Sequence, residues 1–192
     1  MTAKIKLNAA SGGGSFSLQA PSSSSNNRVI TLPDAADGTL ITTTNPKSGS
    51  IIQVVQGTTS TEKTFTTASF VASNLSATIT PTLASSKILI HASFLVDNQA
   101  SGRQIMVALY RSINGGTFTN ISGGSNSAAV GTFGGSSRII ETSSVVRLDT
   151  PSYSVGNSIV YKLYGKSESA AGAVIMNGQG TENVMVLQEV AA

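Results

Sequence analysis

The sequence predicts an all-β protein, with an extended β arm at the N-terminus followed by an antiparallel β-sandwich or jelly roll. Three observations lead to this prediction. Apolar residues recur at every second position in many short segments, which is the period of a half-buried strand. No segment carries an apolar stripe with helical spacing over three turns. The composition is rich in Ser, Thr, Gly and Ala, and only 11% of the residues are charged, which suits closely packed strands better than long helices.

Length and composition limit the possibilities further. The 192 residues are enough for one compact domain and an arm. The absence of cysteine excludes disulfides, thiolate metal sites and cysteine nucleophiles. The net charge of +3 is scattered and no basic run exists, so we expect no nucleic-acid partner. No secretory signal and no apolar run of about 20 residues are present, so we expect synthesis in a cytoplasm and no membrane insertion.

Residues 1–48 form the predicted arm. They repeat an apolar–polar–Leu triplet, in three copies: Ile5-Lys6-Leu7, Phe16-Ser17-Leu18 and Ile30-Thr31-Leu32. Gly- and Ser-rich stretches separate the copies, and Asp37-Gly38 is a strong turn signal, so we expect short strands in an ordered arm. The composition alone also fits a flexible Ser/Gly-rich tail. Asn45-Pro46 begins the turn that precedes the second domain, residues 49–192.

The second domain contains longer strand-like segments. The clearest is 87–96, in which alternate residues from Ile88 to Phe94 are apolar. Asn114-Gly115-Gly116 predicts a hairpin turn, and residues 122–137 predict a long Gly/Ser-rich loop. The predicted strands are 51–55, 64–71, 77–82, 87–96, 103–113, 117–121, 138–148, 158–164, 173–176 and 184–190. Many short strands at fairly even spacing predict a sandwich or jelly roll.

Two of these strands, 87–96 and 184–190, are apolar on both faces, although the outer face of an antiparallel sandwich is usually polar. Either the arm covers these strands or they pack against identical subunits. We favour subunit packing and predict a homotrimer. The candidate interface residues are Leu89, Leu95, Met185 and Leu187.

No residue pattern indicates catalysis or a bound cofactor or metal. The single histidine, His91, lies in the middle of a predicted strand without the second His or Cys that a metal site needs, so we interpret it as structural. Asp34 and Asp37 lie in a turn, where Asp commonly hydrogen-bonds its own backbone. Gly12-Gly13-Gly14 lacks the Lys-Ser/Thr and the helix of a phosphate cradle. We therefore expect a protein that is not an enzyme and uses no cofactor.

The predicted loop 122–137 is the best candidate for external contacts, because long loops on a rigid frame often carry recognition. It contains Phe133 in polar surroundings, and Arg138 follows, with a guanidinium that can pair with a carboxylate or stack on a sugar. The alternative is that Phe133 folds back and caps the core of the sandwich.

The stretch from Gly12 to Thr44 carries two recognisable motifs, Val29-Ile30-Thr31-Leu32-Pro33-Asp34 and Gly38-Thr39-Leu40. With them, roughly the first half of the chain resembles tail-fibre and related virion proteins of bacteriophages, particularly marine and cyanobacterial ones. The resemblance implies a trimeric β-structured part of the virion, with an N-terminal attachment arm and a C-terminal knob.

Three functions are open at this point. The first is a short tail fibre or fibre tip that attaches by its arm and is assembled into the virion in the host cytoplasm. The second is a capsid decoration or cement protein that stabilises the head, because the chain is short for a fibre. The third, a carbohydrate-binding β-sandwich module, is less favoured because such a site normally shows aromatic platforms. The expected partners are other copies of the chain, other phage virion proteins and a host surface glycan or receptor.

Overall fold

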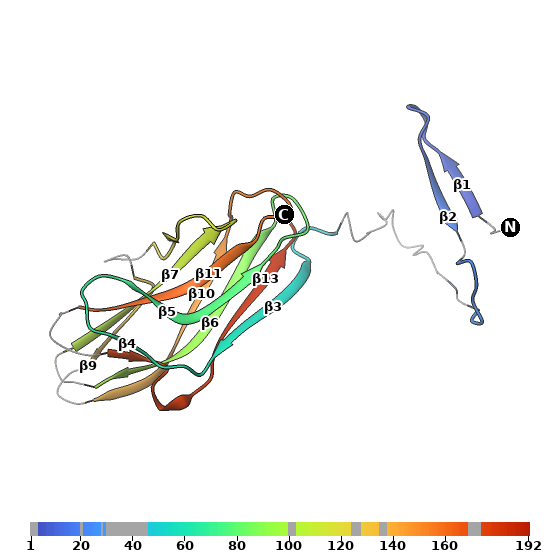
Figure 1. Ribbon diagram of the computed structural model, residues 1–192. Coiled ribbons are helices and arrows are strands. Elements are labelled where there is room, and N and C mark those ends of the chain that lie inside the picture. Colours follow the sequence, from blue (N-terminus) through green and yellow to red (C-terminus); the bar gives the residue numbers. More distant parts are fainter. Residues whose placement is uncertain are drawn as a thin grey trace. The chain divides into compact units, whose positions relative to one another are not determined.

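The computed structural model describes residues 4–19, 21–27, 29, 46–99, 103–123, 128–134, 138–168 and 174–192. The chain divides into two compact units, residues 1–40 and 41–192, which are described separately (Figure 1). The third triplet, the turn with Asp34 and Asp37, and nearly all of the two resemblance motifs lie outside the described residues.

The first unit contains a β-hairpin. Strands β1 (Lys4–Asn8) and β2 (Ser15–Gln19) pair antiparallel, with Ile5 opposite Leu18. The turn between them passes through two glycines with positive φ, Gly12 and Gly13, a conformation that glycine adopts without steric cost. The first two apolar–polar–Leu triplets therefore lie on paired strands, as predicted. Ile5, Leu7 and Leu18 are largely exposed, because a two-stranded hairpin by itself provides no second layer to cover them.

The second unit is a sandwich of two antiparallel sheets. Within the described residues, the first sheet has the order β3 (Ile51–Thr59), β13 (Asn183–Val190), β6 (Lys87–Asn98) and β10 (Ile139–Asp149). Two short strands extend it: β12 (Val174–Met176) pairs with the end of β6, and β4 (Lys63–Phe65) pairs with β12. The second sheet has β5 (Val71–Ile79), β11 (Ile159–Ser167) and β7 (Arg103–Ile113), and both β8 (Thr119–Asn120) and β9 (Val130–Gly134) pair with the far edge of β7. A short 3-10 helix, η2 (Gly178–Gly180), precedes β13.

The long strands have the order of a jelly roll. One sheet is β3–β13–β6–β10 and the other is β5–β11–β7–β9, and every described pairing is antiparallel. Strands that are neighbours within a sheet are far apart in the sequence, so the chain crosses repeatedly between the two layers. Eight strands in two such sheets form a double-sheet jelly roll. The predicted all-β sandwich is confirmed.

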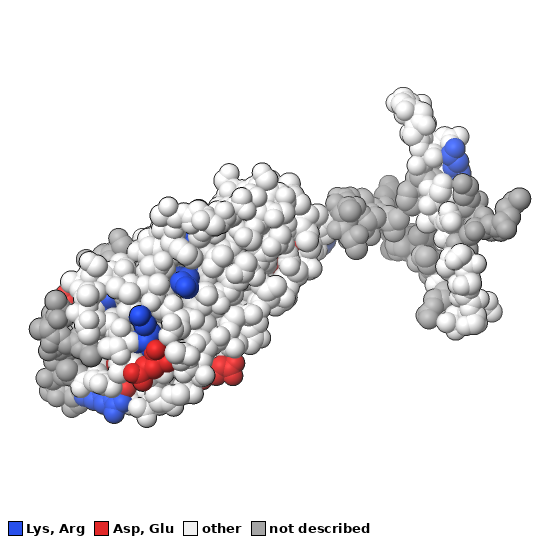
Figure 2. Space-filling model, in the orientation of Figure 1, with Lys and Arg blue, Asp and Glu red and all other residues white. Residues whose placement is uncertain are grey.

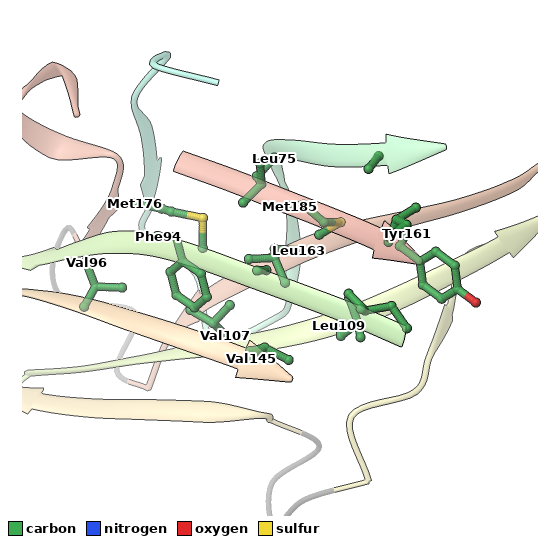
Figure 3. Close-up of a cluster of buried hydrophobic side chains, with 14 of the residues drawn as sticks. Leu75, Phe94, Val96, Val107, Leu109, Val145, Tyr161, Leu163, Met176 and Met185 are labelled. Carbon is green, nitrogen blue, oxygen red and sulfur yellow. The ribbon is translucent and has the colours of Figure 1, made fainter. Parts of the chain in front are cut away.

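The core lies between the two sheets and follows the predicted alternation. On β6, the buried side chains run from Ile88 to Val96 at every second position, and they pack against residues of the opposite sheet such as Leu109 and Leu163 (Figure 3). A glycine allows a close approach of the two sheets. A Cβ on Gly57 of β3 would lie 2.0 Å from the backbone oxygen of Ser76 on β5, so only glycine fits where these strands meet.

A buried carboxylate ties the last strand to the segment before β6. Glu189 is fully buried and accepts hydrogen bonds from Gln53 Nε2 at 2.7 Å, Ser86 Oγ at 2.9 Å and the backbone amides of Thr82 and Leu83 at 3.0 Å. Burial by itself raises the pKa of this carboxyl, but the hydrogen bonds, foremost that from Gln53, outweigh it and lower the pKa below its ordinary value. Glu189 is therefore held as an anion that fixes the 80–86 segment.

Two sequence predictions differ from the observed elements. The predicted strand 64–71 was wrong, since β4 ends at Phe65 and β5 begins at Val71. The predicted loop 122–137 contains strand β9, whose Val130 lies opposite Val107 of β7. Gly131 and Gly134 lie within this short strand and hide its alternation in the sequence, while the free edge of β7 supplies the hydrogen-bonding partner.

Candidate functional site: the two outer faces of the sandwich

The outer face of the first sheet carries no Asp, Glu, Lys or Arg at its centre, where valine and leucine alternate with uncharged Gln, Thr and Ser and with one histidine. The strand register places three cross-strand rows there: Val54–Gln188–Leu89–Leu148, Gln56–Val186–His91–Val146 and Thr58–Val184–Ser93–Ser144. Val146 is 64% exposed, Val54 56% and Leu148 52%. Large apolar side chains on a solvent-facing sheet commonly mark an interaction surface. We call these three rows the apolar face.

Two of the four predicted interface residues lie on this side of the sheet. Leu89 is in the first row, and Leu95 lies two residues beyond Ser93 on the same face of β6; both are half-buried. Met185 and Leu187 are instead fully buried in the core, so they are placed differently from the prediction. Because Met185-Val186-Leu187 is apolar throughout, its pattern does not show which side faces inward. Pointing Met and Leu inward buries more apolar area than pointing Val inward.

His91 lies in the middle row of the apolar face, exposed, with Val186 and Val146 as its cross-strand neighbours. Among the residues that the structure describes, no three His, Cys, Asp or Glu side chains gather in a way that could hold a metal ion. In the same residues, no helix has the length and apolar character to cross a membrane.

The predicted contact residues Phe133 and Arg138 lie near one end of the sandwich. Arg138 donates from Nε to Asp97 Oδ1 at 2.9 Å and from Nη2 to Oδ2 at 2.5 Å. The hydrogen bonds from Arg138 are the main reason that the pKa of the fully buried Asp97 carboxyl is lowered. The guanidinium is thus already paired within the chain. Phe133 lies on β9, is 57% exposed and is not part of the core cluster.

The outer face of the second sheet carries a different surface. Four aromatic rings gather over β7 and β11, from Phe70, Tyr110, Phe118 and Tyr164. Tyr110 and Tyr164 stack with ring centroids 3.9 Å apart, Phe70 meets Tyr110 edge-on at 6.1 Å, and Phe118 lies 5.9 Å from Tyr164. The two longer distances lie in the usual range of about 4.5–7 Å for favourable aromatic pairs, and the stacked tyrosines are closer than that range.

Two lysines complete this surface. Lys166 Nζ lies 4.7 Å from the centre of the Phe70 ring, and Lys162 Nζ lies 5.9 Å from that of Phe118. Both are cation–π distances. All six side chains are half-buried, and partial burial together with Tyr110 raises the pKa of the Tyr164 hydroxyl. We call these six residues the aromatic–lysine patch.

The charged groups of the patch are its two lysines, and the nearest acidic residue in the sequence is the exposed Glu168, just after the end of β11. The strands of the second sheet contain no Asp or Glu, and neither lysine forms an ion pair within the described part of the chain. The nearby Arg111 belongs to the inner side, where it binds Asp149 at 2.8 Å. Sequence reasoning missed the patch because its aromatic residues come from four separate segments. The available signal was that Tyr110 occupies the outward-facing side of the predicted strand 103–113.

A cavity of about 260 Å³ lies between β7 and β10. Its walls include Leu109, Val145 and small residues such as Ala129, and its one charged group, Arg147, already donates to the backbone oxygen of Ser122 at 3.1 Å. Ser122 and Ser144 also line the cavity, so its described walls mix apolar and polar groups around one cation. The two outer faces are the stronger candidates for function.

No protein-family model matches the sequence, and no curated protein is similar to it. Two solved structures with similarity to this chain are those of infectious bursal disease virus, strains Gt and Gx. Their sequence identities are 13% and 14%, with TM-scores of 0.46 and 0.45. Each alignment covers 94% of this chain but only 48% and 46% of the viral chains, so the chain spans about half of their length.

Proposed function

We propose that this protein is a non-catalytic structural subunit of a bacteriophage particle that works as a homo-oligomer. The apolar face carries the proposal. Its three rows present valines and leucines of four neighbouring strands to solvent without a carboxylate, ammonium or guanidinium group among them. Few side chains are charged on the side of the sandwich seen in Figure 2.

A second copy of the chain is the occupant that fits this face best. Covering Val54, Val146 and Leu148 gains about 25 cal/mol for each Å² of apolar surface removed from water. No charged group of the rows has to be dehydrated, which would otherwise oppose association. Flat sheet faces with small and β-branched residues also pack closely against one another. Our choice of a homotrimer, rather than another symmetric oligomer, rests on the resemblance to phage fibre proteins.

The place in the virion that we propose is a short tail fibre or fibre tip, with residues 1–48 as the attachment arm and the sandwich as the knob. The resemblance of the stretch from Gly12 to Thr44 supports this placement, and the hairpin of β1 and β2 offers a separate unit for attachment. A capsid decoration protein is the alternative, favoured by the short chain of 192 residues.

Electron microscopy of particles that carry a labelled full-length chain tests the placement. Label at the tail supports the fibre or fibre tip, and label spread over the head supports the decoration protein. Particles without label under conditions of normal expression reject the virion role. In the same experiment, a chain without residues 1–48 should stay off the particle, and its normal incorporation would show that the arm is not the anchor.

A further inference from the structure

The aromatic–lysine patch has a composition that neither folding nor assembly through the apolar face requires. It brings four of the chain's ten Phe and Tyr residues to one outer sheet face. We propose that this patch is a binding site for an acidic polysaccharide, a glycan whose sugar rings carry carboxylate groups. The inference does not rest on the place of the protein in a virion.

The two positive charges of the patch favour an anionic ligand. Lys162 and Lys166 are the charged residues of the patch, and the five strands of its sheet contain no carboxylate. Each ammonium lies over an aromatic ring and keeps free hydrogen-bond donors, since lysine has three. A carboxylate of the ligand can therefore receive a charge-assisted hydrogen bond, which is stronger than a neutral one.

The aromatic rings of the patch favour a sugar as the ligand. A pyranose has an apolar C–H face and a polar rim, and half-buried tyrosines present an apolar ring and a polar hydroxyl. The Tyr110 and Tyr164 rings stack on each other at 3.9 Å, so a nucleic-acid base cannot enter between them. Two lysines are also few compared with the phosphate contacts of nucleic-acid-binding proteins.

A protein partner fits this patch less well than a glycan. A dry protein interface that covers the rings would also have to remove both ammonium groups from water, because each lies over one of those rings. A hydrated glycan can leave the ammonium groups in contact with water and still use the ring edges. The observations therefore favour the acidic polysaccharide.

The test uses the full-length chain and alginate, a polymer of uronic acids, with neutral dextran and polyglutamate as comparison polymers at one low ionic strength. The wild type should bind alginate and bind dextran and polyglutamate at least tenfold more weakly. Lys162→Gln/Lys166→Gln should weaken alginate binding roughly tenfold or more, since it removes both charge-assisted contacts. Lys47→Gln/Lys87→Gln is the matched control, with the same charge change at two exposed lysines outside the patch.

A second pair of variants tests the rings. Phe118→Leu keeps an apolar side chain but removes one of the four aromatic rings of the patch. It should therefore weaken alginate binding severalfold with little change in melting temperature. Val155→Ala is the control, because it removes apolar area at an exposed site outside the patch, in the turn between β10 and β11, and it should leave binding unchanged. Equal binding to polyglutamate, no binding to alginate, preference for anionic lipid vesicles, or equal losses in the variants and their controls would each overturn the proposal.

Discussion

The two outer faces of the sandwich share one fold but differ in the side chains that they show to water. The first sheet shows Val54, Val146 and Leu148 in rows without charged groups. The second shows stacked tyrosines with Lys162 and Lys166 over aromatic rings. The inner faces of both sheets carry the same kind of alternating apolar core.

The difference between the faces lies in the cost of covering them. Burying the apolar face removes no Asp, Glu, Lys or Arg side chain from water. The free energy gained by burying its valines and leucines is therefore not offset by the desolvation of such a charge. Burying the aromatic–lysine patch would strip water from two ammonium groups, which costs several kcal/mol per unpaired ion. We infer that the first face suits permanent contact between copies of the chain, and that the second suits a hydrated ligand that comes and goes.

The largest expected effect comes from a substitution between the two sheets, because the packing of the sheets supports both outer faces. Gly57→Ala would place a Cβ 2.0 Å from the backbone oxygen of Ser76, where β3 meets β5. The strands would have to separate, so we expect a loss of about 3 kcal/mol or more in the free energy of unfolding. Denaturant unfolding measures this loss of stability. Gly14→Ala is the control, because nothing lies within 4 Å of a Cβ placed on Gly14. Equal stabilities would refute the close approach of the sheets.

The next effect separates the two faces. Val146→Glu places a charge in the middle row of the apolar face, so association should become less favourable by about 3–5 kcal/mol while the fold of the subunit is kept. Val155→Glu is the matched control, because Val155 is 56% exposed in the turn between β10 and β11. Sedimentation should show dissociation in the first variant alone, and alginate binding should persist in both. Equal association of the two variants would place the contact elsewhere.

A smaller effect concerns acid stability of the first sheet. The pKa of Glu189 is lowered in the folded chain, so its stabilisation is present above the ordinary carboxyl value of 4.5 and is lost as the pH falls through the folded value. Asp97 shifts in the same direction because of Arg138. Glu189→Gln should cost about 2 kcal/mol at neutral pH and flatten the loss of stability below about pH 4.5. Unfolding curves between pH 3 and 7 (about the range of carboxyl titration) measure both, and a variant with the wild-type pH profile would exclude Glu189 as a source of acid sensitivity.

The smallest effect is expected at Phe133. Its ring is 57% exposed on β9, so Phe133→Ala should change stability by less than about 0.5 kcal/mol. If the residue contacts a host surface or a neighbouring protein, attachment should weaken although the melting temperature does not change. A clear drop in melting temperature would instead show that the ring supports the core.

Much of the fold was predictable, since alternation of apolar residues in 87–96 and 103–113 specifies which side of a strand is buried. Alternation fails where both sides are apolar, and so it does not show that Met185 and Leu187 point into the core. It also fails for β9, where Val130 and Phe133 stand among glycines. The aromatic–lysine patch depends on register between β5, β7 and β11, and local sequence does not encode which rings meet.

The molar mass of the full-length wild-type chain in a dilution series tests the account most directly. Light scattering at micromolar concentration should give three times the chain mass of 19.5 kDa. A dimer would keep the apolar face as an interface and reject the trimer. A single species of 19.5 kDa at every concentration would contradict the central claim that the apolar face joins copies of this chain.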